Sequence, residues 1–148
     1  MSISKYNSEG YYDPTTYEAL KNIEKEELKM AGLYKPDEFR LLVYICSPYR
    51  GDTEKNTEKA RKYSRFAVES KAIPMTPHLL YPQFMDDSNP EERYLATHVI
   101  NYVLIGKCQE VWVFGEGISE GMGREIALAE KRRMKIRYFT ETMEEAKR

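Results

Sequence analysis

Glu110-Val-Trp-Val-Phe-Gly115 runs into Gly117-Ile-Ser-Glu-Gly-Met-Gly-Arg-Glu125, and a helix-forming segment over residues 124–132 follows. The apolar run before Gly115 indicates a buried strand. In an open α/β sheet, ligands bind between the end of a strand and the start of the next helix. Glycines at that point let backbone N–H groups approach an anion at the positive end of the helix. We therefore expect an anion site here, with the carboxylate of Glu125 beside it in the first turn of the helix.

Strands and helices alternate along the rest of the chain. Apolar runs of strand length predict strands at residues 41–46, 72–75, 110–114 and 135–139. Helical spacing and capping residues, such as Asp13-Pro14, predict helices at residues 14–32, 54–70 and 90–106. We expect a long loop over residues 76–89 and a short helical tail from Glu141 onward. The side chains expected to face inward from the helices at 54–70 and 90–106 are Ala60, Tyr63, Ala67, Leu95, Val99 and Val103.

This alternation predicts the class of fold. Strands separated by helix-length segments imply right-handed βαβ crossovers and a parallel sheet with helices on both faces. We expect a single three-layer, doubly wound α/β domain over residues 41–148, with a flavodoxin-like or Rossmann-like sheet of about four to five strands. Residues 1–40 form an N-terminal helical extension whose polar face suits a solvated flank or a partner-facing appendage. Because functional groups collect at the carboxyl ends of parallel strands, the loops at 47–51, 78–87 and 115–125 should form one pocket.

Length and charge exclude several classes of partner. A chain of 148 residues suits one domain, and its net charge of −1 argues against nucleic acid and anionic membranes as partners. No apolar run approaches the ~20 residues that span a bilayer, and the polar start lacks the apolar core of a signal peptide, so we expect a cytoplasmic protein. Cys46 and Cys108 lie in apolar contexts, which fits buried free thiols better than a disulfide.

Two separated motifs carry a resemblance to a known superfamily. Val43-Tyr-Ile-Cys-Ser-Pro-Tyr-Arg-Gly51 resembles the first strand and loop of the nucleoside 2-deoxyribosyltransferase superfamily. The pattern Ser119-x-Gly121-x-Gly123-x-Glu125 resembles that of its deoxynucleoside monophosphate N-glycosidases. The fuller pattern, which includes Pro77-His-Leu-Leu-Tyr-Pro-Gln-Phe84, is similar to the DUF4406 type of deoxyribosyltransferase-like proteins of bacteria, phages and mobile elements. The resemblance covers roughly residues 41–139.

The resemblance implies a role for each residue of the two motifs. It implies that Glu125 attacks the anomeric carbon and that water or a second base resolves the glycosyl-enzyme. It also implies phosphate binding by Ser119, Gly121, Gly123 and Arg50, and a sugar or base side lined by Tyr44, Ser47, Pro48 and Tyr49. The expected nucleotide-binding residues are Tyr44, Ser47, Pro48, Tyr49, Arg50, Gly51, Gly115, Ser119, Gly121, Met122 and Gly123.

Each principal residue also has a purely structural interpretation. Glu125 could only complement the helix dipole, and Ser119 could be only an N-cap, although capping does not exclude phosphate binding. Arg50 could be a surface arginine that pairs with Asp52 or Glu54. Both interpretations of each residue stay open at the level of sequence.

One position departs from the pattern that the resemblance implies. In the monophosphate N-glycosidases an aspartate lies on the preceding helix, twenty-four residues before the nucleophilic glutamate, and that position is Asn101 here. An amide cannot take up or release a proton as a carboxylate does. Asp86, Asp87 or Glu116 could substitute from a neighbouring loop, or the pocket could only bind its ligand.

His78 and the nearby aspartates have two interpretations as well. His78 follows a predicted strand, where it could act as a general acid or contact the base, or it could be packed in a Pro-rich loop and satisfied by backbone. Asp86 and Asp87 with Asp52 could bind a hard metal ion, but a helix-capping turn before Pro90 explains them more simply. No zinc-ligand spacing, Walker loop or Rossmann dinucleotide motif is present, so we expect no metal and no cofactor.

Three candidate functions of different classes follow. The first is an enzyme that cleaves or transfers at the N-glycosidic bond of a nucleotide. The second is a catalytically silent protein that senses or sequesters a nucleotide signal, such as one derived from ADP-ribose, in conflict between phage and host. A third is an assembly module that docks through its N-terminal helix. The resemblance also implies a homo-oligomer.

Overall fold

The computed structural model describes residues 3–35 and 37–146. The chain divides into two compact units, residues 1–39 and residues 40–148. No helix within the described ranges is long and apolar enough to cross a membrane.

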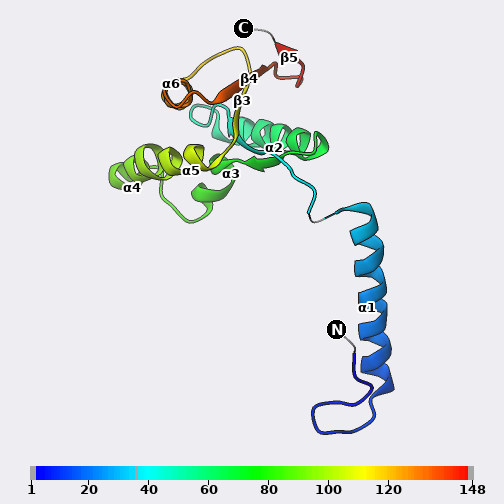
Figure 1. The fold of residues 1–148 in the computed structure, drawn as a ribbon. Helices are drawn as coiled ribbons and strands as arrows, with labels where there is room; N and C mark the ends of the chain where they lie inside the picture. The colour runs from blue at the N-terminus through cyan, green and yellow to red at the C-terminus, as the bar shows by residue number, and fades with distance from the viewer. Residues whose placement is uncertain (1–2, 36, 147–148) are drawn as a thin grey trace. The chain divides into compact units, whose positions relative to one another are not determined.

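The first unit consists mainly of one helix, α1 (Pro14–Leu33) (Figure 1). The predicted start is confirmed, because the side chain of Asp13 accepts a hydrogen bond from the N–H of Thr16 at 3.0 Å and Pro14 is the first helical residue. All of α1 lies in the described part of the chain, and none of its side chains is buried. Its apolar side chains therefore contribute nothing to the core of this unit.

The second unit is built on a five-stranded sheet in the order β2-β1-β3-β4-β5. The strands are β1 (Leu42–Cys46), β2 (Ile73–Met75), β3 (Glu110–Phe114), β4 (Lys135–Phe139) and β5 (Glu145–Ala146). The first four are mutually parallel, and β5 pairs antiparallel with β4. The predicted parallel sheet and its strand positions are thus confirmed to within a residue.

The predicted helical tail is wrong. The chain turns back after β4, where the N–H of Thr140 donates to the carbonyl of Glu144 at 2.9 Å, and forms β5. The guanidinium of Arg137 then contacts both carboxylate oxygens of Glu145, at 2.9 and 2.7 Å. A two-pronged ion pair across neighbouring strands stabilises the hairpin, and residues beyond Glu141 had too short a pattern to reveal it.

Helices cover both faces of the sheet. One face packs Val43 and Ile45 with aromatic side chains of β3 and β4 and with α2 (Thr53–Glu69). The other face packs Tyr44 and Cys46 with α5 (Asn101–Lys107) and α6 (Glu120–Lys131). Alternate residues of β1 therefore point to opposite faces, as the period of a strand requires. Cys46 and Cys108 are free and buried on the second face, as predicted.

The inward-facing residues of α2 are those predicted, whereas those of the next long helix are not. Ala60, Tyr63 and Ala67 are buried. Residues 90–107 form one helical rod with three parts: α4 (Pro90–Tyr94), the π-helical segment η2 (Leu95–Ile100) and α5 (Figure 1). The side chains predicted to face inward are 44–50% exposed, namely Leu95, Val99 and Val103.

Two physical reasons explain that error. The π segment closes i→i+5 hydrogen bonds, so the helical period on which the prediction relied does not hold there. In addition, the rod contributes the polar side chains of Arg93, Thr97 and Asn101 to a cavity, while Leu95, Val99 and Val103 are exposed. Asn101 and Ile105 are the buried residues of α5.

The segment predicted as a long loop at 76–89 contains two short helices. These are α3 (Pro77–Leu80) and the 3₁₀ turn η1 (Tyr81–Gln83). Pro77 and Pro82 each occupy an early helical position. Backbone N–H groups at these positions have no partner within the helix, so a proline there removes no hydrogen bond. The compact turns hold the side chains of this segment over the carboxyl end of the sheet.

Candidate functional site

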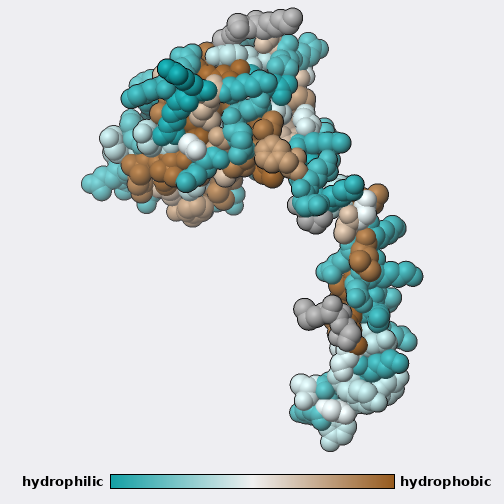
Figure 2. All heavy atoms as spheres, in the orientation of Figure 1, coloured by the Kyte–Doolittle hydropathy of each residue, from teal (hydrophilic) through white to brown (hydrophobic). Residues whose placement is uncertain are grey.

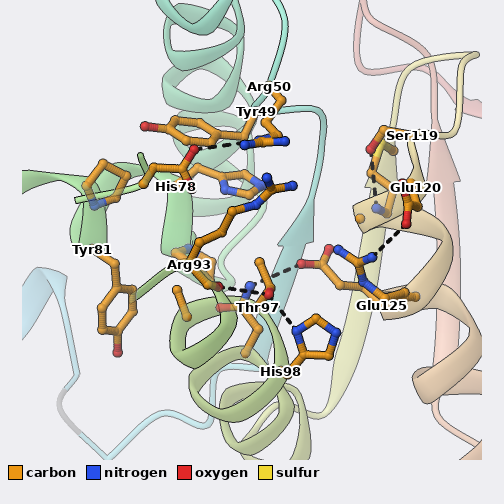
Figure 3. Close-up of a pocket in the computed structure, with 18 of the residues that line it drawn as sticks. Tyr49, Arg50, His78, Tyr81, Arg93, Thr97, His98, Ser119, Glu120 and Glu125 are labelled. Atoms are coloured by element: carbon orange, nitrogen blue, oxygen red, sulfur yellow. Dashed lines mark hydrogen bonds and ion pairs between the residues drawn. The ribbon is translucent and has the colours of Figure 1, made fainter. Parts of the chain in front are cut away.

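A cavity of about 400 Å³ lies at the carboxyl ends of β1 and β3. Its walls come from the loops that topology predicted to converge, and the rod formed by α4, η2 and α5 supplies a further wall (Figure 3). The convergence is therefore confirmed. It follows from the parallel sheet, which brings the carboxyl ends of neighbouring strands to one edge.

The cavity gathers some of the predicted site residues and not others. Those that line it are Ser47, Tyr49, Arg50, His78, Asn101, Ser119, Gly121, Met122 and Glu125. Those outside the lining are Tyr44, Pro48, Gly51, Gly115 and Gly123. Gly51 and Gly115 have positive φ values of 98° and 94°, so each serves a backbone turn that other residues rarely adopt.

Glu125 lies deeper in its helix than the sequence predicted. The hydroxyl of Ser119 accepts a hydrogen bond from the N–H of Met122 at 3.3 Å, so α6 begins at Glu120 and Glu125 falls in the second turn. The predicted start near Arg124 is wrong because Gly121 and Gly123, which are poor helix formers, lie within the first turn. The structural interpretation of Ser119 as an N-cap is confirmed.

The surroundings of Glu125 set its protonation. The carboxyl oxygen Oε1 accepts a hydrogen bond from the hydroxyl of Tyr44 at 2.8 Å and one from Nδ2 of Asn101 at 3.4 Å. Burial raises the pKa of Glu125 to about 7, although the contacts with Tyr44 and Cys46 and the charge of Arg124 oppose that rise. Complementing the helix dipole does not account for this residue, because the dipole acts on the first turn and Glu125 is buried in the second.

Three buried polar atoms of the described residues lack a hydrogen-bond partner: Ser47 Oγ, Asn101 Oδ1 and Glu125 Oε2. All three belong to residues that line the cavity. Buried polar atoms in folded proteins almost always have a partner, and an exception needs a cause. All three atoms therefore have unused hydrogen-bonding capacity in residues of the cavity lining.

Cationic side chains surround the cavity. Arg50 is a largely exposed arginine, as its structural interpretation has it, but it lies 3.6 Å from Asp87 of a neighbouring loop and not against Asp52 or Glu54. Asp52 instead caps α2, where its carboxylate accepts a hydrogen bond from the N–H of Lys55 at 3.1 Å. Arg124 contacts Glu120 at 3.1 Å.

Arg93 is a functional candidate that sequence reasoning missed. It points from α4 into the cavity (Figure 3), is partly buried, and makes no ion pair with any described residue. Thr97 and Asn101 follow it at helical spacing and line the same wall. Polar residues therefore recur every four positions, at 93, 97 and 101. This pattern in the sequence could have indicated which side of the helix lines the cavity.

His78 matches its structural interpretation. Its ring stacks on Tyr49 with centroids 5.0 Å apart, and Nε2 lies 3.0 Å from the carbonyl oxygen of Ser47. Burial lowers the pKa of His78, so the ring is neutral near pH 7 and Nε2–H donates to that carbonyl. The contact ties the segment after β2 to the loop after β1.

The predicted capping turn before Pro90 is confirmed. The side chain of Asn89 accepts a hydrogen bond from the N–H of Glu91 at 3.0 Å, and Asp86 accepts one from the N–H of Ser88 at 2.9 Å. Within residues 3–35 and 37–146, no group of three or more His, Cys, Asp or Glu side chains is placed to hold a metal ion.

The fold and the cavity define the class of this protein: an α/β protein with a cavity at the carboxyl edge of a mostly parallel sheet. Residues 41–139 match the family described as a domain of unknown function (DUF7768). The match covers more than half of the chain, so the protein belongs to that family. It extends from the residue before β1 to the end of β4 and includes the cavity. Comparison with curated proteins gives no match.

Proposed function

We propose that the cavity binds a nucleotide or a nucleotide-derived molecule, and that Glu125 cleaves or transfers at the N-glycosidic bond. The observation that carries this proposal is the carboxyl of Glu125, which is buried, lines the cavity and has an unpartnered Oε2. A carboxylate removed from water is a stronger nucleophile toward an oxocarbenium-like carbon than a hydrated one.

The proposed reaction uses the two oxygens of Glu125 differently. Tyr44 holds Oε1, which leaves Oε2 to bond to C1′ of the sugar while the bond from C1′ to the base nitrogen breaks. Water, or a second base in a transfer reaction, then attacks C1′ and releases the carboxylate. The pKa of about 7 leaves about half of Glu125 ionised at neutral pH, so activity should increase as pH rises through 7.

The charges around the cavity support a phosphate-bearing ligand. Arg93 is a partly buried cation without an ion pair among the described residues, and Arg50 and Arg124 line the cavity nearby. Guanidinium groups bind phosphate oxygens through two parallel hydrogen bonds. Ser119 and Gly121 lie at the start of α6, where the helix dipole favours an anion.

A catalytically silent nucleotide-binding protein is the second candidate, and Asn101 favours it. Its amide lies 3.4 Å from Glu125, which is the place where a catalytic acid would assist departure of the base. Of the alternative acids, Glu116 lies outside the cavity lining, hydrogen bonds from Ser88 lower the pKa of Asp86, and Asp87 lies 3.6 Å from the guanidinium of Arg50. Without an acid to protonate the base, the pocket would bind or sequester its ligand intact.

The finer fold assignment is also part of this proposal. The order β2-β1-β3-β4, all parallel, supports a doubly wound sheet of the flavodoxin type, in which ligands bind where the strand order reverses. That reversal lies between β1 and β3, at the position of the cavity.

The homo-oligomer stays a prediction. Figure 2 shows hydrophobic side chains gathered over the rod formed by α4, η2 and α5. The exposed apolar residues of that rod are Tyr94, Leu95, Val99, Tyr102 and Val103. A row of apolar side chains of this kind supports contact with a second copy, since isolated proteins seldom leave large apolar patches in water.

Base release separates the two candidate functions. The protein is incubated with a panel of ribonucleotides and deoxyribonucleotides, and free base is measured by chromatography. Release that disappears in Glu125→Gln and persists in Glu130→Gln, a matched change at an exposed position of the same helix outside the cavity lining, supports the enzyme. Tight binding with intact nucleotide recovered would support the silent binding protein, and no binding by any nucleotide would contradict both.

A further inference from the structure

We propose that the sugar bound in this cavity is a ribose, and that Oδ1 of Asn101 accepts a hydrogen bond from its 2′-hydroxyl. The inference rests on the proposed function, because it assumes that Glu125 faces C1′ of a sugar. It goes further, since it decides between ribose and 2′-deoxyribose.

The orientation of the Asn101 amide is the first step. Asn101 is 7% exposed, and its Nδ2 lies 3.4 Å from Oε1 of Glu125. The amide presents its nitrogen to Oε1, which is the orientation that the ionised carboxylate requires because it only accepts hydrogen bonds. The amide oxygen Oδ1 therefore faces elsewhere, and it is buried without a partner. An amide oxygen only accepts, so a ligand that completes this site must bring a donor to it.

The position of that donor on the sugar is the second step. The two amide atoms of Asn101 are bonded to one carbon, so Oδ1 lies beside the carboxylate that Nδ2 contacts. With Glu125 against C1′, the sugar hydroxyl nearest to this carboxylate is the one on C2′. In a ribose that hydroxyl can donate to Oδ1. A 2′-deoxyribose presents C–H there and leaves the buried oxygen without a partner.

The size of the preference follows from the cost of a buried, unpaired acceptor. That cost corresponds to roughly a five- to hundredfold weaker binding of the 2′-deoxy compound. Hydrogen bonds to this hydroxyl also strengthen as C1′ becomes cationic, so any discrimination in cleavage should be at least as large as that in binding. The remaining unpartnered atoms, Ser47 Oγ and Glu125 Oε2, lie in the same lining and meet the same sugar.

Matched pairs of nucleotides test the inference. Binding of AMP and dAMP, GMP and dGMP, CMP and dCMP, and UMP and dUMP is measured by calorimetry with the full chain, and ligand integrity is checked by chromatography. For pairs that are cleaved, the ratio of base-release rates in an equimolar mixture replaces the ratio of Kd values. We expect the ribonucleotide to be preferred roughly five- to hundredfold in each pair that binds. A third compound, 3′-deoxy-AMP, keeps the 2′-hydroxyl and should bind like AMP.

Two variants then assign the preference to one residue. Asn101→Leu, which keeps the branching of the side chain and removes its polar atoms, should bring the ratio close to one. Thr97→Val is the control, because Thr97 lines the same wall but its hydroxyl already donates to the carbonyl of Arg93 at 2.9 Å. If Asn101→Leu does not fold, Asn101→Ser removes the same acceptor with less loss of polarity.

The outcomes separate this inference from the proposed function. Equal or tighter binding of the deoxynucleotides overturns the ribose assignment and leaves nucleotide binding in place. If 3′-deoxy-AMP binds more weakly than AMP while dAMP does not, the hydrogen-bond partner of Oδ1 is the 3′-hydroxyl. That result also overturns the assignment of Oδ1 to the 2′-hydroxyl. A preference that survives in Asn101→Leu overturns the role of Asn101. No binding by any member of the panel overturns the proposed function, and the inference falls with it.

Discussion

Replacing Glu125 by glutamine should make the protein more stable at alkaline pH. The carboxyl of Glu125 is 8% exposed, and burial raises its pKa from 4.5 to about 7. The folded chain therefore holds a proton on this group that the unfolded chain releases between pH 4.5 and pH 7. Glutamine has a similar shape and no proton to lose, so the variant lacks this source of pH dependence.

The magnitude follows from the raised pKa. Below pH 4.5 both states carry the proton, and the contribution of Glu125 to the free energy of unfolding does not depend on pH. Between pH 4.5 and about 7, the free energy of unfolding falls by about 1.4 kcal/mol for each pH unit. Above pH 7 the contribution of Glu125 again does not depend on pH. The total loss is about 3 kcal/mol. For a domain of this size, 3 kcal/mol corresponds to a change in Tm of roughly 6–12 °C.

Thermal unfolding at a series of pH values measures this effect. Wild-type protein and Glu125→Gln are compared at pH 5 and pH 8 by calorimetry, because the other titrating groups are common to both and cancel in the difference. We expect the Tm of the variant minus the Tm of the wild type to be larger at pH 8 than at pH 5. Glu130→Gln, at an exposed position of α6 outside the cavity lining, serves as the control. A difference between wild type and Glu125→Gln that is the same at both pH values would refute the reasoning.

Three further predictions concern the neighbours of this group and the outer surface. Tyr44→Phe removes the 2.8 Å hydrogen bond to Glu125 and should raise the pKa of that carboxyl by roughly one to two pH units, measured by carbon-13 NMR of labelled glutamate; an unchanged titration would contradict it. Ser119→Ala removes the cap of α6 and should lower the free energy of unfolding by about 1 kcal/mol in urea titrations, whereas a change near zero would show that the 3.3 Å contact contributes little. Val99→Asp should convert a homo-oligomer to a monomer in sedimentation equilibrium, and a wild-type monomer at the same concentration would dismiss the oligomer.

The architecture was largely predictable because its signals are local. Continuous apolar runs indicated the four parallel strands, and the glycine-containing segment after β3 indicated the edge at which a site forms. The short strand β5 was missed, because its pairing depends on contacts between Arg137 and Glu145 that no periodicity displays. The start of α6 was placed too late because two glycines lower the helical propensity of a turn that the Ser119 cap stabilises.

The candidate site was predictable in its location and less so in its composition. The three loops and the residues Ser47, Arg50, Ser119 and Glu125 do meet at one cavity. The wall formed by Arg93 and Thr97 was missed, because apolar spacing was used to find the inward face of a helix whose inward face is polar. A helix that contributes polar side chains to a cavity departs from the usual relation between hydropathy and burial, and the π segment further shifts its period.

The sequence by itself determined a parallel α/β sheet and the edge where its loops converge, because strand and helix periods and the direction of the crossovers act over a few neighbouring residues. Only the tertiary structure decided the state of Glu125. Its partners lie 81 residues away at Tyr44 and 24 residues away at Asn101, and its raised pKa results from burial among them. Burial and the pairing of polar atoms are properties of packed neighbours, so they arise only when distant segments come together.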